Sequence, residues 1–262
     1  MEVHSSESKI AKQGDYLFYT YNGEIYLVAY IGDGEDISLP ETYNGQNYCI
    51  YEYAFYACTS LVSVTIPDGV VSIGLGAFKD CSSLESMTIP FAGANPYASG
   101  YEAHFGYIFG YSCQKVYEDP SGYGRPDFYH YLNCYSYEYE PGYWYEYYEY
   151  YTYYIPESLK TVTVTGEVSG NAFENCTSLE NVIIGNGVST IGNYAFYNCT
   201  SLTSMTIGNG VTTIDSYAFY NCTSLRSIKY RGTEDEWNTI SKESDWDYNT
   251  GGYTITYNYT GE

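Results

Sequence analysis

Apolar residues return along this chain in a fixed order about every 23 residues. In one unit, Leu61 is followed by Val64 and Ile66, which alternate at the two-residue period of a β-strand. Pro67 ends that strand, and later apolar positions return the chain to the core. A fixed period of this size predicts stacked units rather than one globular core. The turn sequence Ala-Phe-x-x-Cys-x-x-Leu begins at Ala54, Ala77, Ala172, Ala195 and Ala218.

One unit of this pattern is too small to be stable alone. Its inward positions are apolar, as at Val70, Ile73, Ala77, Phe78 and Leu84. At roughly 1.5–3 kcal/mol for each fully buried large side chain, a unit gains on the order of 10 kcal/mol, which is similar to the cost of ordering it. The sequence therefore predicts a mostly β solenoid in which neighbouring units cover one another. Such extended surfaces favour binding over catalysis.

Small polar residues fill the strand positions between the inward ones. Ser63 and Thr65 occupy them in one unit, and Ser204 and Thr206 in a later one. Stacked strands would gather these side chains on a flat, weakly charged face. Such a face can receive a ligand, but we favour the interpretation that it is a solvated sheet face.

Cysteine also has a fixed place in the repeat. Stacked coils would place equivalent cysteines about 5 Å apart with their side chains pointing the same way, whereas a disulfide needs Cβ atoms about 3.8 Å apart. We therefore predict a ladder of buried free thiols, because cysteine is a good small buried residue. Cys113 and Cys134 lie outside this position, and a bond between them stays open. The predicted ladder comprises Cys58, Cys81, Cys176, Cys199 and Cys222.

Tyrosine is the unusual residue type of this chain. There are 38 tyrosines, and 19 of them lie between Phe91 and Ser158, where the repeat pattern is interrupted. The segment from Cys134 to Glu140 alternates aromatic and polar residues at the period of a strand. Glu140-Pro141-Gly142-Tyr143 fits a type II turn. The segment therefore predicts a hairpin arm, or a strand pair, that projects from the solenoid.

Three interpretations of this arm stay open. Tyrosine gives large contact area at low entropic cost, which favours a binding surface with Trp144 at its centre. An exposed aromatic edge can instead pair with a second copy, or the segment can be low-complexity sequence without a role. We favour the first interpretation. The predicted contact residues are Tyr135, Tyr137, Tyr139, Tyr143, Trp144, Tyr145, Tyr147, Tyr148, Tyr150 and Tyr151.

The charge balance excludes several classes of partner. The net charge is −22, from 32 acidic and 10 basic residues. Binding phosphates needs clustered Lys and Arg, so we predict no nucleic-acid partner and no anionic lipid surface. The sequence contains no run of about 18 apolar residues, so we predict no membrane span. The polar segment from Met1 to Gly14 lacks the apolar stretch of a secretory signal.

We predict no metal site or cofactor. His104 and His130 share the insertion with Cys113 and Cys134, but their irregular spacing and the lack of a C-x-x-C motif argue against zinc. A buried or solvated histidine is the favoured interpretation. The run from Asp33 to Asp36 is acidic but lacks the longer ligand pattern of a calcium loop.

Catalysis is not predicted either, and we expect no catalytic residues. Glu138, Glu140, Glu146 and Glu149 could supply paired carboxylates for glycoside cleavage. Nothing in this repetitive segment, however, would raise the pKa of one carboxyl above that of another.

Four formal glycosylation sequons accompany the repeats. In three of them the middle residue is the repeat cysteine, so we interpret the Asn and Thr as turn residues that cap backbone groups. The sequons begin at Asn175, Asn198, Asn221 and Asn258.

The repeat resembles that of a known family. Phe-x-x-Cys-x-x-Leu-x-x-Val-x-Ile-Pro, with Val-x-x-Ile-Gly-x-x-Ala-Phe, is similar to the BspA-like leucine-rich repeat, also called the Treponema pallidum type. The segments 43–48 and 232–251 resemble its lead-in and closing units, and 104–110 resembles a segment that interrupts such arrays. The resemblance covers about Leu39 to Tyr257. It implies a right-handed solenoid with a parallel sheet, in secreted or surface bacterial proteins that bind host or neighbouring-cell molecules.

These inferences give one predicted organisation. Residues 1–38 form a lead-in cap, 39–90 and 159–230 carry the leucine-rich repeats, 91–158 form the tyrosine-rich insertion, and 231–262 form a closing cap. The predicted function is that of a non-enzymatic surface or secreted protein that binds a protein or glycan on host cells, neighbouring cells or matrix. Self-association through the arm and a carbohydrate-active enzyme are the two alternatives.

Overall fold

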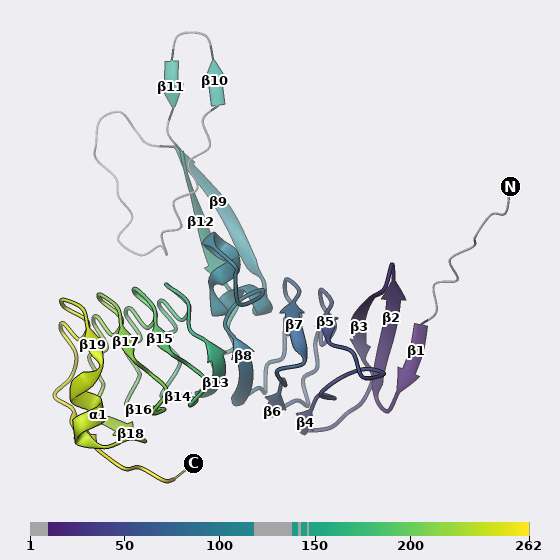
Figure 1. The fold of residues 1–262 in the computed structure, drawn as a ribbon. Helices are drawn as coiled ribbons and strands as arrows, with labels where there is room; N and C mark the ends of the chain where they lie inside the picture. The colour runs from purple at the N-terminus through teal and green to yellow at the C-terminus, as the bar shows by residue number, and fades with distance from the viewer. Residues whose placement is uncertain (1–9, 118–137, 141–142, 146, 262) are drawn as a thin grey trace, which may run out of the picture.

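The coils of this protein stack into one elongated array. The computed structural model describes residues 10–117, 138–140, 143–145 and 147–261, and gives the backbone alone for the described residues within 113–150. The chain forms a mostly β parallel solenoid of about eight turns, about 23 residues apart. Figure 1 shows the turns following one another from the N-terminus to the C-terminus, which confirms the predicted fold class.

The main sheet receives one strand from each coil. Its eight strands pair in parallel and in register, so that Ser63 lies beside Ser86 and Asn181 beside Ser204. The strands are β4 (Asp36–Ser38), β6 (Ser63–Thr65), β8 (Ser86–Phe91), β13 (Thr161–Glu167), β14 (Asn181–Ile184), β16 (Ser204–Ile207), β18 (Ser227–Tyr230) and β20 (Thr254–Thr256).

Side chains along the main-sheet strands alternate between buried and more exposed positions, as the sequence pattern predicts. Val64, Met87 and Val162 are buried at successive positions along one row of the sheet. The residues between them form rows of mostly small polar side chains, as predicted, although Ile183 and Lys229 interrupt one row. Thr206 departs from this pattern, because it is buried in the row between Ile183 and Lys229.

Shorter strands line the other side of the coils. An antiparallel meander at the N-terminus pairs with the first of them and covers the end of the stack, where Phe18 and Leu27 are buried. One sheet has the order β1 (Ile10–Gln13), β2 (Tyr16–Tyr21), β3 (Glu24–Tyr30), β5 (Tyr48–Ile50), β7 (Val70–Ile73); the other has the order β15 (Thr190–Ile191), β17 (Thr213–Ile214), β19 (Ser241–Lys242).

A column of phenylalanine rings runs through the core. Phe173, Phe196 and Phe219 are fully buried, and the centroids of adjacent rings lie 5.1 and 5.5 Å apart with an interplanar angle of 2°. The Trp246 ring continues the column 5.7 Å from Phe219. Each coil therefore contributes one ring to a stack that only its neighbours complete.

A short helix closes the C-terminal end of the stack. In α1 (Glu234–Thr239) the Thr233 hydroxyl accepts a hydrogen bond from the Glu236 N–H, and the Glu236 side chain accepts one from the Thr233 N–H. This capping box fixes the start of the helix. Trp237 is buried, with its ring 5.2 Å from Tyr230.

The tyrosine-rich insertion forms an arm. β9 (Tyr111–Tyr117) pairs antiparallel with β12 (Tyr147–Tyr153), and β10 (Glu138–Glu140) pairs antiparallel with β11 (Tyr143–Tyr145). Figure 1 shows both pairs projecting away from the coils, with β10 and β11 farthest from them. The predicted hairpin is confirmed by this antiparallel pairing, in which Glu140 lies opposite Tyr143. The predicted turn at Pro141-Gly142 lies outside the described residues.

Candidate functional site

The arm is inserted into a coil that is otherwise complete. β8 and β13 pair directly, with Ser86 opposite Thr161, so the main sheet continues across the insertion. Before the arm, two 3₁₀ helices span Gly100–Ala103 and Phe105–Phe109. The Phe105 N–H donates to the Ala172 carbonyl at 2.7 Å, and the Phe105 ring lies 4.9 Å from the Phe173 ring. This segment takes the place of an Ala-Phe turn, so the chain leaves the core only after it and not at Phe91.

The chain rejoins the coil at a position equivalent to the repeat cysteine. The Leu159 N–H donates to the Pro156 carbonyl at 3.1 Å, as the Leu84 N–H donates to the Cys81 carbonyl at 3.2 Å. Pro156 therefore stands where the other coils carry cysteine. The leucine that follows is fully buried, which places the next strand in register.

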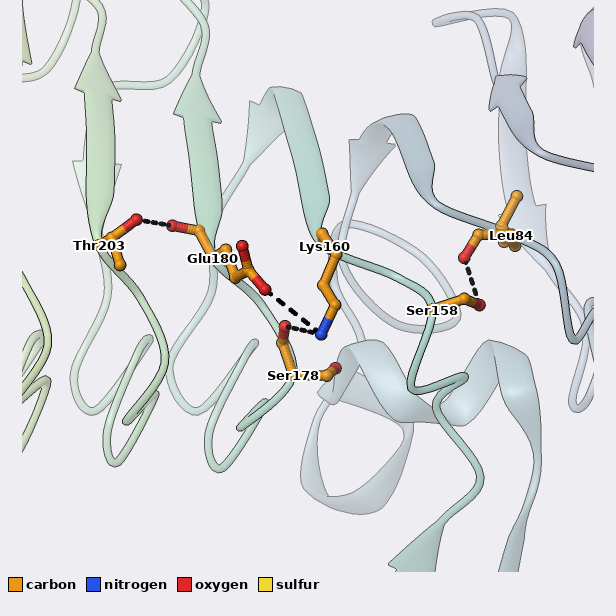
Figure 2. A network of polar contacts seen from close by, with 6 residues as sticks. All are labelled: Leu84, Ser158, Lys160, Ser178, Glu180 and Thr203. Atoms are coloured by element: carbon orange, nitrogen blue, oxygen red, sulfur yellow. Dashed lines mark hydrogen bonds and ion pairs between the residues drawn. The ribbon is translucent and has the colours of Figure 1, made fainter.

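Polar contacts fix this return to the coils on both sides (Figure 2). The Ser158 hydroxyl donates to the Leu84 carbonyl of the preceding coil at 2.8 Å. Lys160 forms an ion pair with Glu180 of the following coil at 3.4 Å and donates to the Ser178 carbonyl at 3.4 Å. The ion pair is exposed and adds little energy by itself, but the hydrogen bonds hold the end of the arm in one position.

Aromatic side chains pack at the base of the arm. The Tyr151 ring stacks 5.0 Å from Tyr101, and its centroid lies 4.9 Å from Tyr111 in an edge-on contact. The Tyr153 ring stacks 5.5 Å from His104, and its hydroxyl donates to the Tyr101 carbonyl at 2.8 Å. Burial raises the pKa of Tyr153, so this hydroxyl stays protonated. The base of the arm is therefore packed rather than hinged.

The structure distributes the predicted contact residues along this arm. Tyr139, Tyr143, Trp144 and Tyr145 belong to the hairpin of β10 and β11, and Tyr147, Tyr148 and Tyr150 belong to β12. Tyr151 differs, because it is only 6% exposed and packs into the base cluster. We therefore leave Tyr151 out of the contact surface proposed below. Tyr135 and Tyr137 lie outside the described residues.

The other candidate groups of the insertion do not form a described site. His104 is buried beside Tyr153, in agreement with the favoured interpretation. His130, Cys134 and Glu146 lie outside the described residues, and the side chain of Cys113 is not described. Within the described part of the chain, no group of three or more His, Cys, Asp or Glu side chains is arranged to hold a metal ion.

The sequence analysis missed a second group of tyrosines, which lies on the coils themselves. Tyr194 stacks on Tyr217 at 5.1 Å, and Tyr197 stacks on Tyr220 at 5.1 Å. The Tyr248 ring continues the second row 5.3 Å from Tyr220. The sequence signal was the repeated Tyr-Ala-Phe-Tyr, in which the residues that flank each buried Ala-Phe pair recur one coil later.

Asparagines form a ladder beside these tyrosines. Asn249 donates to Asn221 at 2.7 Å, Asn221 to Asn198 at 2.6 Å, and Asn198 to Asn175 at 2.7 Å, each from Nδ2 to Oδ1. All four have a left-handed backbone with φ of 55–61°. This confirms the predicted turn position for Asn175, Asn198 and Asn221, and Asn258 has it too, with φ of 53°. The predicted capping of backbone groups is wrong for these amides, because coils in register bring them within reach of one another.

Glu174 ends the ladder. Its carboxylate accepts hydrogen bonds from Asn171 at 2.6 Å and from Asn175 at 3.2 Å, so every amide in the series donates toward this one group. Glu174 occupies the position that Tyr197 takes one coil later. Burial raises the pKa of its carboxyl, and the two amide donors partly oppose the shift.

Replacing Glu174 with glutamine is expected to stabilise the protein at neutral pH. The folded state keeps a proton on this carboxyl at pH values where the unfolded chain has lost it, so stability falls as the pH rises from the ordinary pKa of 4.5 to the raised value. Glutamine carries no charge and removes that loss. Chemical denaturation should show the gain at neutral pH and no difference below pH 4.5. A less stable variant at neutral pH would mean that the amide hydrogen bonds outweigh desolvation.

The cysteine ladder is present as predicted. Cys81, Cys176, Cys199 and Cys222 are buried free thiols, and Cys58 is half-buried. The Cys199 and Cys222 thiols each donate to a phenylalanine carbonyl of the preceding coil at 3.1 Å. Burial raises the pKa of Cys176 and Cys199, so these thiols stay protonated and unreactive.

Thiol alkylation is expected to separate two classes of cysteine. In the native protein, iodoacetamide should modify the half-buried Cys49 and Cys58 and leave Cys199 and Cys222 unmodified, because alkylation needs an accessible thiolate. Peptide mass spectrometry before and after denaturation measures the difference. Rapid native labelling of Cys199 would contradict the buried ladder.

The repeat geometry corresponds to a known sequence family. The profile of the BspA type leucine rich repeat region matches residues 34–96 and 145–244, in six copies, which is more than half of the chain. The chain belongs to the BspA type leucine-rich repeat family. The resemblance carried by the Phe-x-x-Cys-x-x-Leu pattern is thereby confirmed. Within the described residues, no helix has the length and apolarity to cross a membrane.

The solved structures to which this chain is similar share little sequence with it. A T. pallidum leucine rich repeat protein is 18% identical, with a TM-score of 0.36, over 94% of this chain and 86% of that one. A leucine rich cell surface protein from Faecalibacterium prausnitzii A2-165 is 19% identical, with a TM-score of 0.29, over 90% and 98%. The pneumococcal vaccine antigen PcpA is 15% identical, with a TM-score of 0.35, over 91% and 48%. No curated protein matches the sequence.

Proposed function

We propose that this chain is a non-enzymatic binding protein that acts at the bacterial cell surface or outside the cell. In this proposal the coils hold the tyrosine-rich arm out toward a protein or glycan on host cells, neighbouring cells or matrix. Membership of the BspA type leucine-rich repeat family supports a protein-binding or adhesion-type role. Stacked repeats provide a stiff, extended mount for such a role.

The observation that carries this proposal is the arm itself. β9 and β12 rise from the coils and end in the hairpin of β10 and β11, which contains Trp144 between two tyrosines (Figure 1). A long aromatic hairpin that leaves the core is costly to keep in water unless it contacts something. Tyrosine and tryptophan are the residue types that dominate the binding energy of interfaces.

The base of the arm supports the same role. The stacked rings of Tyr101 and Tyr151, and the hydrogen bond from Tyr153, anchor β12 to the coils. The bonds from Ser158 and Lys160 fix the chain where it rejoins them. An arm held in one orientation loses less entropy on binding than a free loop, which favours affinity.

Replacing Trp144 with alanine tests this function. The protein and its variant are applied to an array of glycans and host matrix proteins, and we expect the variant to lose at least about ten-fold in affinity, as for a central interface tryptophan. Tyr97→Ala is the matched control, because Tyr97 is 93% exposed but lies outside the arm. Equal binding by all three proteins would remove the arm from the proposal.

Mass photometry over a dilution series distinguishes binding of other molecules from self-association of this chain. A binding protein for other molecules should stay monomeric at all concentrations. Growth in mass with concentration that is abolished by Trp144→Ala would instead favour pairing of the arm with a second copy.

A further inference from the structure

The tyrosines on the coils form a surface that is separate from the arm. We call it the tyrosine strip and define it as Tyr194, Tyr197, Tyr217, Tyr220 and Tyr248. Its two rows run along the stack, and within one coil the two rings meet edge to face, with centroids 5.6 Å apart for Tyr194 and Tyr197. The two rows therefore form one continuous aromatic surface parallel to the axis of the coils.

The hydroxyl groups of the strip are not used by the fold. None of the five forms a hydrogen bond with another residue of the described chain. Beside them, Asn198, Asn221 and Asn249 each use one amide hydrogen in the ladder, and an amide nitrogen carries two. The strip thus combines aromatic surface with a regular series of polar groups that are free to bind a ligand.

The spacing of these groups selects the kind of ligand. Successive rings of the longer row lie 5.1 and 5.3 Å apart along the stack. An extended peptide strand advances about 3.3 Å per residue, so its side chains on one face repeat at about 6.6 Å and drift out of register with the rings. In an extended β-linked glycan, the distance from one sugar ring to the next is similar to the distance between the tyrosine rings of successive coils.

The chemistry of the strip supports the same choice. Sugar rings offer C–H groups to aromatic rings, and hydroxyls to amide and phenol groups. An amphipathic helix would instead need an apolar groove, which four half-buried rings, the exposed Tyr248 and the polar margin of the strip do not provide.

The charge of the protein excludes one further class of ligand. None of the ten basic residues belongs to the strip or its asparagine margin, and the whole chain carries −22. Glu174 lies at one end of the strip, where burial raises the pKa of Tyr197, with smaller contributions from Tyr220 and from the charge of Glu174. An anionic polymer would be repelled from this surface, whereas an uncharged chain would not.

We propose that the tyrosine strip binds an extended, uncharged β-linked glycan chain, with one sugar ring for each coil. The ligand lies along the axis of the stack, with its rings against the row of Tyr197, Tyr220 and Tyr248 and its hydroxyls hydrogen-bonded to the phenols and asparagine amides. This site does not depend on a ligand contact by the arm.

Calorimetric titration of the full chain with cello-oligosaccharides and chito-oligosaccharides of increasing length tests the site. Affinity should rise with each added sugar until the chain spans the three coils of the strip, and then level off. The triple variant Tyr197→Phe, Tyr220→Phe, Tyr248→Phe keeps the rings and removes three hydroxyls. It should weaken the longest ligand at least about ten-fold, because each lost hydrogen bond contributes a factor of a few.

Two further variants make the result decisive. Tyr53→Phe with Tyr56→Phe changes the same motif at the far end of the stack and should leave binding intact. Trp144→Ala distinguishes the two surfaces, because loss of oligosaccharide binding in that variant but not in the triple variant would move glycan binding to the arm and overturn the strip. Failure of both oligosaccharide series to bind, or equal affinity for short and long chains, would also overturn it without affecting the proposal for the arm.

Discussion

Replacing Phe196 with alanine is expected to lower the free energy of unfolding by about 3–5 kcal/mol, among the largest effects of any single substitution in this chain. Phe196 is fully buried between Phe173 and Phe219, with ring centroids 5.1 and 5.5 Å away. The variant loses its own buried area and the contacts of two neighbours. Because neighbouring coils cannot close over the gap independently, little of the cavity should be recovered.

Denaturant unfolding followed by circular dichroism measures this change. Tyr56→Ala is the control, because this aromatic follows Phe55 in the same motif but is 55% exposed. We expect its effect to stay within about 0.5 kcal/mol. A loss of less than about 1 kcal/mol for Phe196→Ala would mean that the stack repacks, contrary to the nearest-neighbour description of the coils.

The coils were predictable because each position in the repeat has one environment. Inward positions such as Leu61 and Ile66 are apolar in every copy, and a strict period leaves few ways to bury them other than stacking. The thiol ladder follows from the same register, since one buried position repeats with one residue type. The hairpin of the arm was predictable for local reasons, from the alternation before Pro141-Gly142 and from the turn sequence Glu140 to Tyr143.

Other features depend on contacts that no local pattern reveals. β9 lacks the aromatic alternation of the arm, and its pairing with β12 joins Tyr111 to Tyr153 across the whole insertion. The segment Phe105–Phe109 fills a coil although it lacks the Ala-Phe-x-x-Cys sequence. Its role became clear only from the hydrogen bond to Ala172 and the ring contact with Phe173.

The tyrosine strip could not be predicted from the sequence for a different reason. Tyr197 and Tyr220 each look like an ordinary turn residue in the sequence, because a single tyrosine beside a buried Ala-Phe pair predicts nothing. Only the register of successive coils converts them into stacked rings 5.1 Å apart. The asparagine ladder and its end at Glu174 arise in the same way. Ligand-binding surfaces on repeat proteins are thus properties of the stack, not of one unit.

Replacing Gly210 with alanine is expected to destabilise the protein by about 1–3 kcal/mol or more, as for other overpacked sites. A Cβ atom at this position would lie 2.0 Å from the Asn186 carbonyl oxygen of the preceding coil. That atom belongs to the backbone and cannot rotate away, so the two coils must separate locally. The neighbouring glycine, Gly208, faces the same constraint, with the Gly185 carbonyl oxygen 2.5 Å from its added Cβ.

Gly252→Ala is a control in which we expect no loss of stability. No heavy atom lies within 4 Å of a Cβ built at Gly252, and its backbone is not left-handed. Alanine there should be neutral or should stabilise by up to about 0.4–1 kcal/mol, because it reduces the entropy of the unfolded chain. Thermal melts of both variants against the parent protein measure the two shifts. If the melting temperatures of the two variants shift with the same sign and size, the coils tolerate a side chain at Gly210. The close approach of neighbouring coils would then not be what requires glycine there.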